Sequence, residues 1–166
     1  MPTKKTSKPI KQVQNQITKL LDAAKVKYKV IEHKVVYTAH DAAQTTKKKL
    51  GEIAKVVLVK TDQSWALIVV PAGKYLDLAG IKKVLKAKKV SIASEKDIAK
   101  YLKTKVSLLH PFGSVYNIPT MLDKGLSRTK KIIASAGSYT HSVELAIKDF
   151  EKIVRPIKGV FAKNKR

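Results

Sequence analysis

The stretch GEIAKVVLVK, residues 51–60, is the part of the sequence from which the fold can be built outward. Its apolar run Val56–Val59 is typical of a strand, in which alternate residues share a face. Lys55 therefore shares a face with the valines two and four positions further along, whereas Lys60 lies on the opposite face. Because both faces are apolar, we expect a central strand over 54–60. Lys55 either packs its stem and leaves its amine in solvent, or turns the amine into a covered site.

The residues that follow predict an antiparallel hairpin. Thr61-Asp-Gln-Ser64 has turn composition, and Trp65–Val70 is a second apolar strand. Pro71-Ala-Gly73 ends that strand. Asp77 can cap a helix that carries Leu78, Ile81, Val84 and Leu85 on one stripe.

Short elements make up the rest of the chain. Ser94 with an acid three residues later predicts a capping box and a helix through Leu102. We also expect helices over 10–24, 41–49 and 147–154, and strands over 27–32, 90–92, 115–118, 131–134 and 142–145. This order lacks strict β-α alternation, so it predicts an α+β fold with a mixed or antiparallel sheet. We expect one domain over residues 10–160, with flexible basic tails at 1–9 and 161–166.

Composition limits the class of protein. The 166 residues are 44% hydrophobic, enough for one domain with a core, and include no cysteine, so disulfides and thiolate chemistry are excluded. The apolar runs are too short for a membrane helix, and the N-terminus lacks the apolar segment of a secretory signal. We therefore expect a cytoplasmic protein.

The charge balance favours a polyanionic partner. The chain has 35 basic and 12 acidic residues, a net charge of +23, which suits nucleic acid. Nearly all of the basic residues are lysines, which contact phosphates as point charges rather than reading base edges. A solvated lysine-rich surface is the alternative interpretation.

Several kinds of chemistry have no signature. The sequence contains no glycine-rich phosphate loop and no nucleophile elbow. None of the four histidines pair at a four-residue spacing, so we expect neither a metal site nor a cofactor. What remains is a set of small polar residues in predicted loops: Tyr37-Thr38, Pro111-Phe-Gly113-Ser114, and Gly137-Ser138 with His141. Their backbone amides could hold an oxyanion or a carbonyl near one lysine, although each glycine could also serve an ordinary turn.

The sequence resembles the YbaK/prolyl-tRNA-synthetase-associated editing domain family over about His33 to Pro156. Each matching motif is short, but their order extends over most of the expected domain. The matching segments are His33 with Tyr37-Thr38-Ala39 and Ala42; Ile53–Lys60; Val69–Ala72; Leu76–Leu78; Lys89–Ser94 with Ile98; Pro111–Gly113; Ala136–Ser138 with His141; Asp149-Phe150; and Arg155-Pro156.

The resemblance implies a curved, barrel-like mixed sheet flanked by helices, and a deacylase that removes amino acids wrongly esterified to tRNA. Lys55 would match the family's essential lysine, which orients the ester end and the terminal adenosine. Water would be activated by backbone groups and by the ribose hydroxyl of tRNA, with neither a metal nor a covalent enzyme intermediate. The candidate substrate-binding residues are Tyr37, Thr38, Ser107, Pro111, Gly113, Ser114, Gly137, Ser138 and His141.

One position departs from the family pattern. The loop that is usually Gly-x-x-x-Pro is Ser107-Leu-Leu-His-Pro111 here. A serine can present the same backbone N–H if its φ is negative, whereas a positive φ would strain the loop.

Two functions follow from these features. The first is a stand-alone trans-editing hydrolase that acts on aminoacyl-tRNA. The second is a non-catalytic tRNA- or RNA-binding module of the same fold, to which an aminoacyl-tRNA synthetase could be a further partner. A DNA-binding regulator is disfavoured because no helix-turn-helix with recognition arginines is visible. The edited amino acid and the oligomeric state stay open.

Overall fold

The computed structural model describes residues 11–35, 48–62 and 64–164. A mixed five-stranded sheet, in the order β5-β2-β3-β6-β9, forms its centre. β2 (Ala54–Thr61) and β3 (Trp65–Pro71) pair antiparallel from Lys60↔Trp65 to Ala54↔Pro71, which confirms the predicted hairpin. β5 (Val90–Ile92) pairs antiparallel with β2, while β6 (Thr120–Asp123) and β9 (Ile157–Gly159) continue the sheet in parallel.

A second sheet is antiparallel and joins the first at one point. It consists of β1 (Tyr28–Glu32), β8 (His141–Ala146) and β7 (Lys131–Ser135) in that order. An isolated parallel bridge between Ile53 and Ile133 links the two sheets. β4 (Tyr75–Leu76) and β10 (Ala162–Lys163) form a small third sheet. The α+β class is thus confirmed, but no sheet in the described part of the chain closes, so the barrel-like shape is not confirmed.

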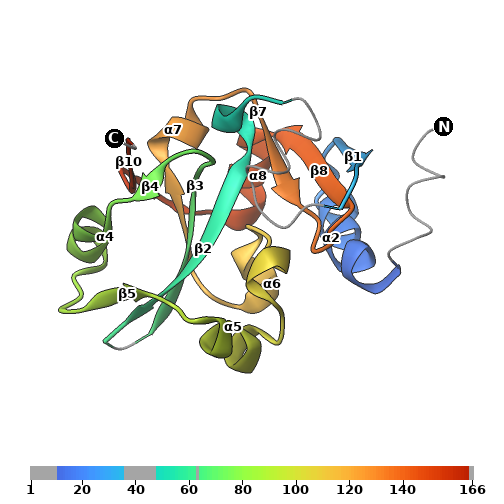
Figure 1. The fold of residues 1–166 in the computed structure, drawn as a ribbon. Coiled ribbons are helices and arrows are strands. Elements are labelled where there is room, and N and C mark those ends of the chain that lie inside the picture. The colour runs from blue at the N-terminus through green and yellow to red at the C-terminus, as the bar shows by residue number, and fades with distance from the viewer. Residues whose placement is uncertain (1–10, 36–47, 63, 165–166) are drawn as a thin grey trace.

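Helices cover the sheets on several sides. Figure 1 shows β2 crossing the centre of the molecule, with α4 and β5 on one side and the three-stranded sheet with α2 on the other. The predicted caps are present: Asp77 accepts from the Gly80 N–H, and Ser94 and Asp97 form a capping box. The helices are α2 (Lys11–Ala23), α4 (Leu78–Leu85), α5 (Glu95–Leu102), α6 (Gly113–Tyr116), α7 (Lys124–Ser127) and α8 (Ile147–Val154), with 3-10 turns η1 (Leu50–Glu52) and η2 (Val106–Leu108).

Both faces of β2 are covered, as the sequence predicts. On the Lys55 face, Val59 packs in a cluster with Ile81 of α4 and with Phe161. On the other face, Leu58 packs with Ile98 of α5. One face of the three-stranded sheet packs against α2 and α8. The cluster there includes Ile17, Leu21, Ile132, Ala134, Val143, Leu145 and Phe150.

The strand expected over 115–118 is wrong. Residues 113–116 form α6, which ends at Asn117 with φ 62, and the strand begins only after Pro119, at Thr120. The fully buried Phe112 fixes the start of α6 against Phe150, so tertiary packing overrides the strand propensity of Val115.

The predicted boundary between the domain and its C-terminal tail, after residue 160, lies too early in the chain. The side chain of Phe161 is fully buried, and its backbone N–H donates to Asp123 Oδ1 over 2.8 Å. The next two residues form β10, so the segment assigned to the C-terminal tail belongs to the fold as far as Lys163. The helix expected over 41–49 lies outside the described residues apart from Lys48 and Lys49, which are not helical, and the N-terminal tail lies outside them.

Candidate functional site

A cavity of about 790 Å³ lies beside β2, where the two large sheets separate. Among the described strands, β5 pairs with β2 over Val59–Thr61, and β7 meets the chain at Ile53 through the isolated bridge. Residues 54–58 lie between these two contacts and line the cavity. The cavity thus occupies the interval in which β2 has a strand partner on its β3 side alone.

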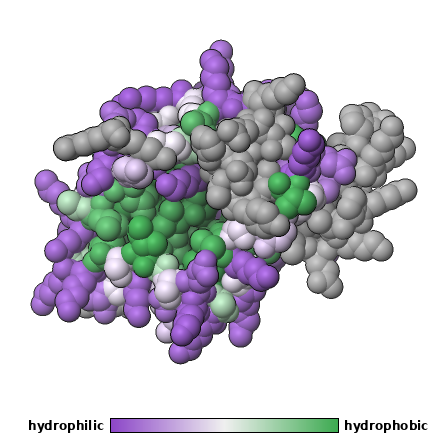
Figure 2. All heavy atoms as spheres, viewed as in Figure 1, coloured by the Kyte–Doolittle hydropathy of each residue, from purple (hydrophilic) through white to green (hydrophobic). Residues whose placement is uncertain are grey.

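Most of the cavity wall is apolar. Its lining includes Leu58, Leu76, Ile92, Ile98 and Leu109, drawn from β2, β4, β5, α5 and the loop after η2. Figure 2 shows these elements forming a continuous hydrophobic area bordered by hydrophilic residues. Such a wall can shelter the apolar part of a ligand from water.

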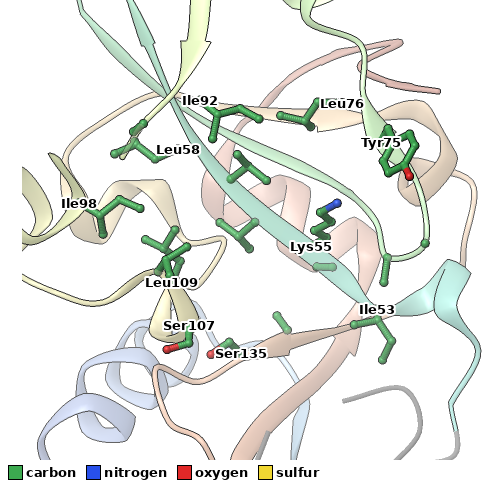
Figure 3. Close-up of a pocket in the computed structure, with 18 of the residues that line it drawn as sticks. Ile53, Lys55, Leu58, Tyr75, Leu76, Ile92, Ile98, Ser107, Leu109 and Ser135 are labelled. Atoms are coloured by element: carbon green, nitrogen blue, oxygen red, sulfur yellow. The ribbon is translucent and has the colours of Figure 1, made fainter. Parts of the chain in front are cut away.

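Lys55 brings a positive charge into this wall. Its side chain is half-buried, and its Nζ donates a hydrogen bond of 3.0 Å to the Lys74 carbonyl oxygen. In Figure 3 the Lys55 amine is directed toward the end of the cavity where Tyr75 and Leu76 lie. Lys163 of β10 also lines the cavity. Lys60, five residues further along β2, is instead exposed, with its Nζ 5.5 Å from the centre of the Trp65 ring.

The opposite end of the cavity carries hydroxyl groups. Figure 3 places Ser107 and Ser135 there, and Ser138 and Ser142 complete this set of lining serines. The Ser107 hydroxyl donates to the Tyr139 hydroxyl oxygen over 3.2 Å. Ser107 lies in η2 and is not among the described residues with positive φ, so the serine in the family's glycine position causes no backbone strain there.

Two histidines lie next to this serine end. His33 Nε2 lies 2.9 Å from Ser142 Oγ. His141 Nδ1 lies 2.9 Å from Thr140 Oγ1, which is 3.3 Å from Ser138 Oγ. His141 is almost wholly buried, and this desolvation lowers its pKa, opposed by the nearby Glu32 carboxylate. The lowered pKa favours the neutral form of His141, whose Nδ1 lies within hydrogen-bond distance of Thr140 Oγ1.

The structure separates the sequence-predicted site residues into groups. Lys55, Ser107 and Ser138 line the cavity, and His141 contacts Ser138 only through Thr140. Gly137, with φ 77, adopts a conformation that favours glycine and donates to Ser135 Oγ. Pro111 and Gly113 are buried outside the lining, and Ser114 is exposed. Tyr37 and Thr38 lie outside the described residues.

Packing in the core explains why the residues after Pro111 do not line the cavity. A Cβ on Gly113 would lie 1.9 Å from Thr120 Oγ1, so this glycine permits a close approach between α6 and β6. The neighbouring Phe112 is fully buried and lies against Phe150 with ring centroids 5.6 Å apart. The loop therefore presents an apolar side chain to the core rather than to the cavity.

The cavity is also lined by residues that the sequence analysis does not include in the site: Tyr75, Ser135, Ser142 and Lys163. Ser135 of β7 and Ser142 of β8 lie directly opposite each other, and pairing of the two predicted strands could have indicated this. Lys163 was missed because it was assigned to a tail.

Comparison with known proteins identifies the family. A family model described as the aminoacyl-tRNA editing domain matches residues 33–153. The chain belongs to this family. This editing domain is 27% identical over 141 residues to the prolyl-tRNA editing protein ProX of Acetoanaerobium sticklandii, covering 81% of this chain and 86% of that protein.

Two solved structures share the fold of this editing domain. A crystallised hypothetical protein has a TM-score of 0.81 at 17% identity, covering 89% of this chain and 99% of its own. A candidate trans-editing enzyme for prolyl-tRNA synthetase has a TM-score of 0.79 at 16% identity, covering 93% of this chain and 99% of its own. Within the described residues, no helix has the length and hydropathy needed to span a bilayer. The described histidine and acidic side chains form no group of three that could ligate a metal ion.

Proposed function

We propose that this chain is a stand-alone trans-editing hydrolase that cleaves the ester of mischarged aminoacyl-tRNA in the cytoplasm. One observation carries the proposal: the half-buried Lys55 amine lies in an apolar cavity whose other end is formed by serine hydroxyls. A cation and an apolar wall suit the phosphate-bearing adenosine end of tRNA, and the hydroxyls suit the polar aminoacyl group. The names of the ProX relative and of the trans-editing structure support tRNA for proline as the carrier and prolyl-tRNA synthetase as a partner.

The reaction needs few protein groups. Water adds to the ester carbonyl carbon, the bond between that carbon and the ribose oxygen breaks, and the ribose oxygen takes up a proton. A free amino acid and a tRNA with a restored hydroxyl leave. The Lys55 amine orients the carrier so that the ester lies inside the cavity, where positioning lowers the entropic part of the barrier. In this scheme the ribose hydroxyl of tRNA assists the water. No step passes through a metal or a covalent enzyme intermediate.

Deacylation assays on tRNA for proline charged with a panel of amino acids test the proposal. Lys55→Ala should lower kcat/KM on the cleaved substrate by at least about 100-fold, because a positioned charge is lost. Lys60→Ala is the matched control, since Lys60 lies on the same strand outside the cavity, and it should retain full activity.

Two outcomes would overturn the proposal. If the chain binds tRNA tightly, with a steep dependence on salt, but cleaves no ester, it is a binding module. If Lys55→Ala and Lys60→Ala hydrolyse equally well, Lys55 is not the residue that orients the substrate.

A further inference from the structure

Ser142 lies on the cavity face of the three-stranded sheet. Its cross-strand partner is Ser135, which also lines the cavity. The alternate residues Ala134 and Val143 pack in the core cluster beneath α2 and α8, on the other face. Since side chains alternate across a strand, the Ser142 side chain points away from that core and toward the cavity.

The contacts of His33 fix the hydrogen-bonding role of Ser142. His33 Nδ1 lies 2.8 Å from the Lys34 carbonyl oxygen, and a carbonyl oxygen can only accept a hydrogen bond. With a single proton on the ring, that proton lies on Nδ1, and Nε2 is an acceptor. The Ser142 hydroxyl, 2.9 Å from Nε2, must donate its hydrogen to His33. Its oxygen can then only accept from a ligand.

The cavity therefore has a cationic end and an end that carries a hydrogen-bond acceptor. The Lys55 amine and the Lys163 side chain belong to the cationic part of the lining, near β4 and β10. At the serine end, Ser142 offers lone pairs and no free hydrogen. An aminoacyl ester is complementary to this arrangement, with an anionic phosphodiester on its nucleoside and a cationic ammonium on its α-carbon.

We propose that Ser142, held by His33, is a specificity-determining acceptor for the α-ammonium of the aminoacyl group. This inference rests on the proposed deacylase function. The Ser142 oxygen accepts one ammonium hydrogen, which places the amino acid at the serine end and the nucleoside at the Lys55 end. His33 is a positioning residue, because it sets the direction of the hydroxyl hydrogen without contacting the ester.

Paired substrates test this role. We would measure kcat/KM on an aminoacyl-tRNA and on the matching α-hydroxyacyl-tRNA, in which a hydroxyl replaces the ammonium. Ser142→Ala should lower the value for the ammonium ester by roughly 10- to 100-fold, as expected for a lost hydrogen bond to a charged group. The same variant should lower the value for the hydroxy ester by a smaller factor, less than about tenfold, because a neutral hydroxyl makes a weaker hydrogen bond to the Ser142 oxygen. Intrinsic ester reactivity cancels, because each ester is compared between variant and parent.

Further variants separate positioning from folding. His33→Gln keeps an acceptor for the Ser142 hydroxyl and should preserve most of the discrimination, whereas His33→Leu should lose it. Ser91→Ala, at an exposed serine of β5, is the control. An equal loss on both esters in Ser142→Ala, with an unchanged melting temperature, would overturn the inference. So would a parent enzyme that cleaves both esters at rates proportional to their uncatalysed hydrolysis. Cleavage of neither ester by the parent would instead refute the proposed function itself.

Discussion

His110 stacks on Tyr116 with ring centroids 4.3 Å apart and an angle of 13° between the planes. The His110 side chain is buried, and its Nδ1 accepts a hydrogen bond from the Phe112 N–H. Burial lowers the pKa of His110 to about 4 and raises that of Tyr116 to about 12. The pair is therefore neutral in the folded state and supports the loop that leads into α6.

The lowered pKa of His110 predicts acid sensitivity. The unfolded chain binds a proton at His110 near its ordinary pKa of about 6.5, whereas the folded chain binds it only near 4. The contribution of His110 to folding is complete above about pH 6.5 and is lost as the pH falls toward 4, by up to about 3 kcal/mol. His110→Asn keeps an acceptor near Nδ1 and removes the titration. Urea unfolding between pH 4 and 7 should show a smaller pH dependence in this variant, and equal slopes would contradict the prediction.

Gly113→Ala should destabilise the protein by about 2 kcal/mol or more, because its new Cβ would overlap Thr120 Oγ1 and lie 2.7 Å from the Ile118 carbonyl oxygen. Gly51→Ala is the matched control, since a Cβ there meets nothing within 4 Å, and it should be close to neutral. Thermal melts of both variants measure the difference. If Gly113→Ala lost deacylase activity without losing stability, Gly113 would instead act in substrate binding.

The C-terminal segment should be needed for stability. A chain that ends at Val160 loses the buried Phe161 ring and leaves Asp123 Oδ1 without the N–H groups of Phe161 and Ala162. Loss of a large buried aromatic side chain costs about 3–5 kcal/mol, so this truncation should melt far below the full chain. A chain that ends at Asn164 retains these contacts and should melt with the full chain. A true tail at 161–166 would make the two truncations alike.

Ser107→Gly should retain activity within about threefold, because Ser107 already has an unstrained backbone and glycine can adopt the same φ. We expect a loss of stability of about 0.5–1 kcal/mol from the greater freedom of glycine in the unfolded chain. Kinetics on the cleaved ester, with a denaturation curve for each protein, check both effects. A large gain in activity would show that the Ser107 side chain obstructs the cavity.

Local patterns allowed most elements to be predicted. The apolar run of β2, the turn that follows it and the caps at Asp77 and Ser94 depend on neighbours in sequence, and the structure contains each of them. The failures have long-range causes. Val115 favours a strand locally but belongs to a helix anchored by Phe112, and Phe161 looks like part of a tail until Asp123, 38 residues earlier, binds its N–H.

The candidate site was predicted only in part for the same reason. Lys55 could be found because its own strand marks it. Ser135 and Ser142 become neighbours only through the pairing of β7 with β8, and Tyr75 and Lys163 through the pairing of β4 with β10. A glycine in a predicted loop did not by itself indicate a ligand site. Gly113 is required because a larger residue would collide with Thr120, and it does not line the cavity.

The bridge between Ile53 and Ile133 joins the two large sheets at one edge of the cavity. A small change in the angle between the sheets would alter the width of the cavity without replacing any residue that lines it. The core cluster under α2 and α8 includes Ala54 and Ala134, which also line the cavity, so its packing and the width of the cavity are coupled.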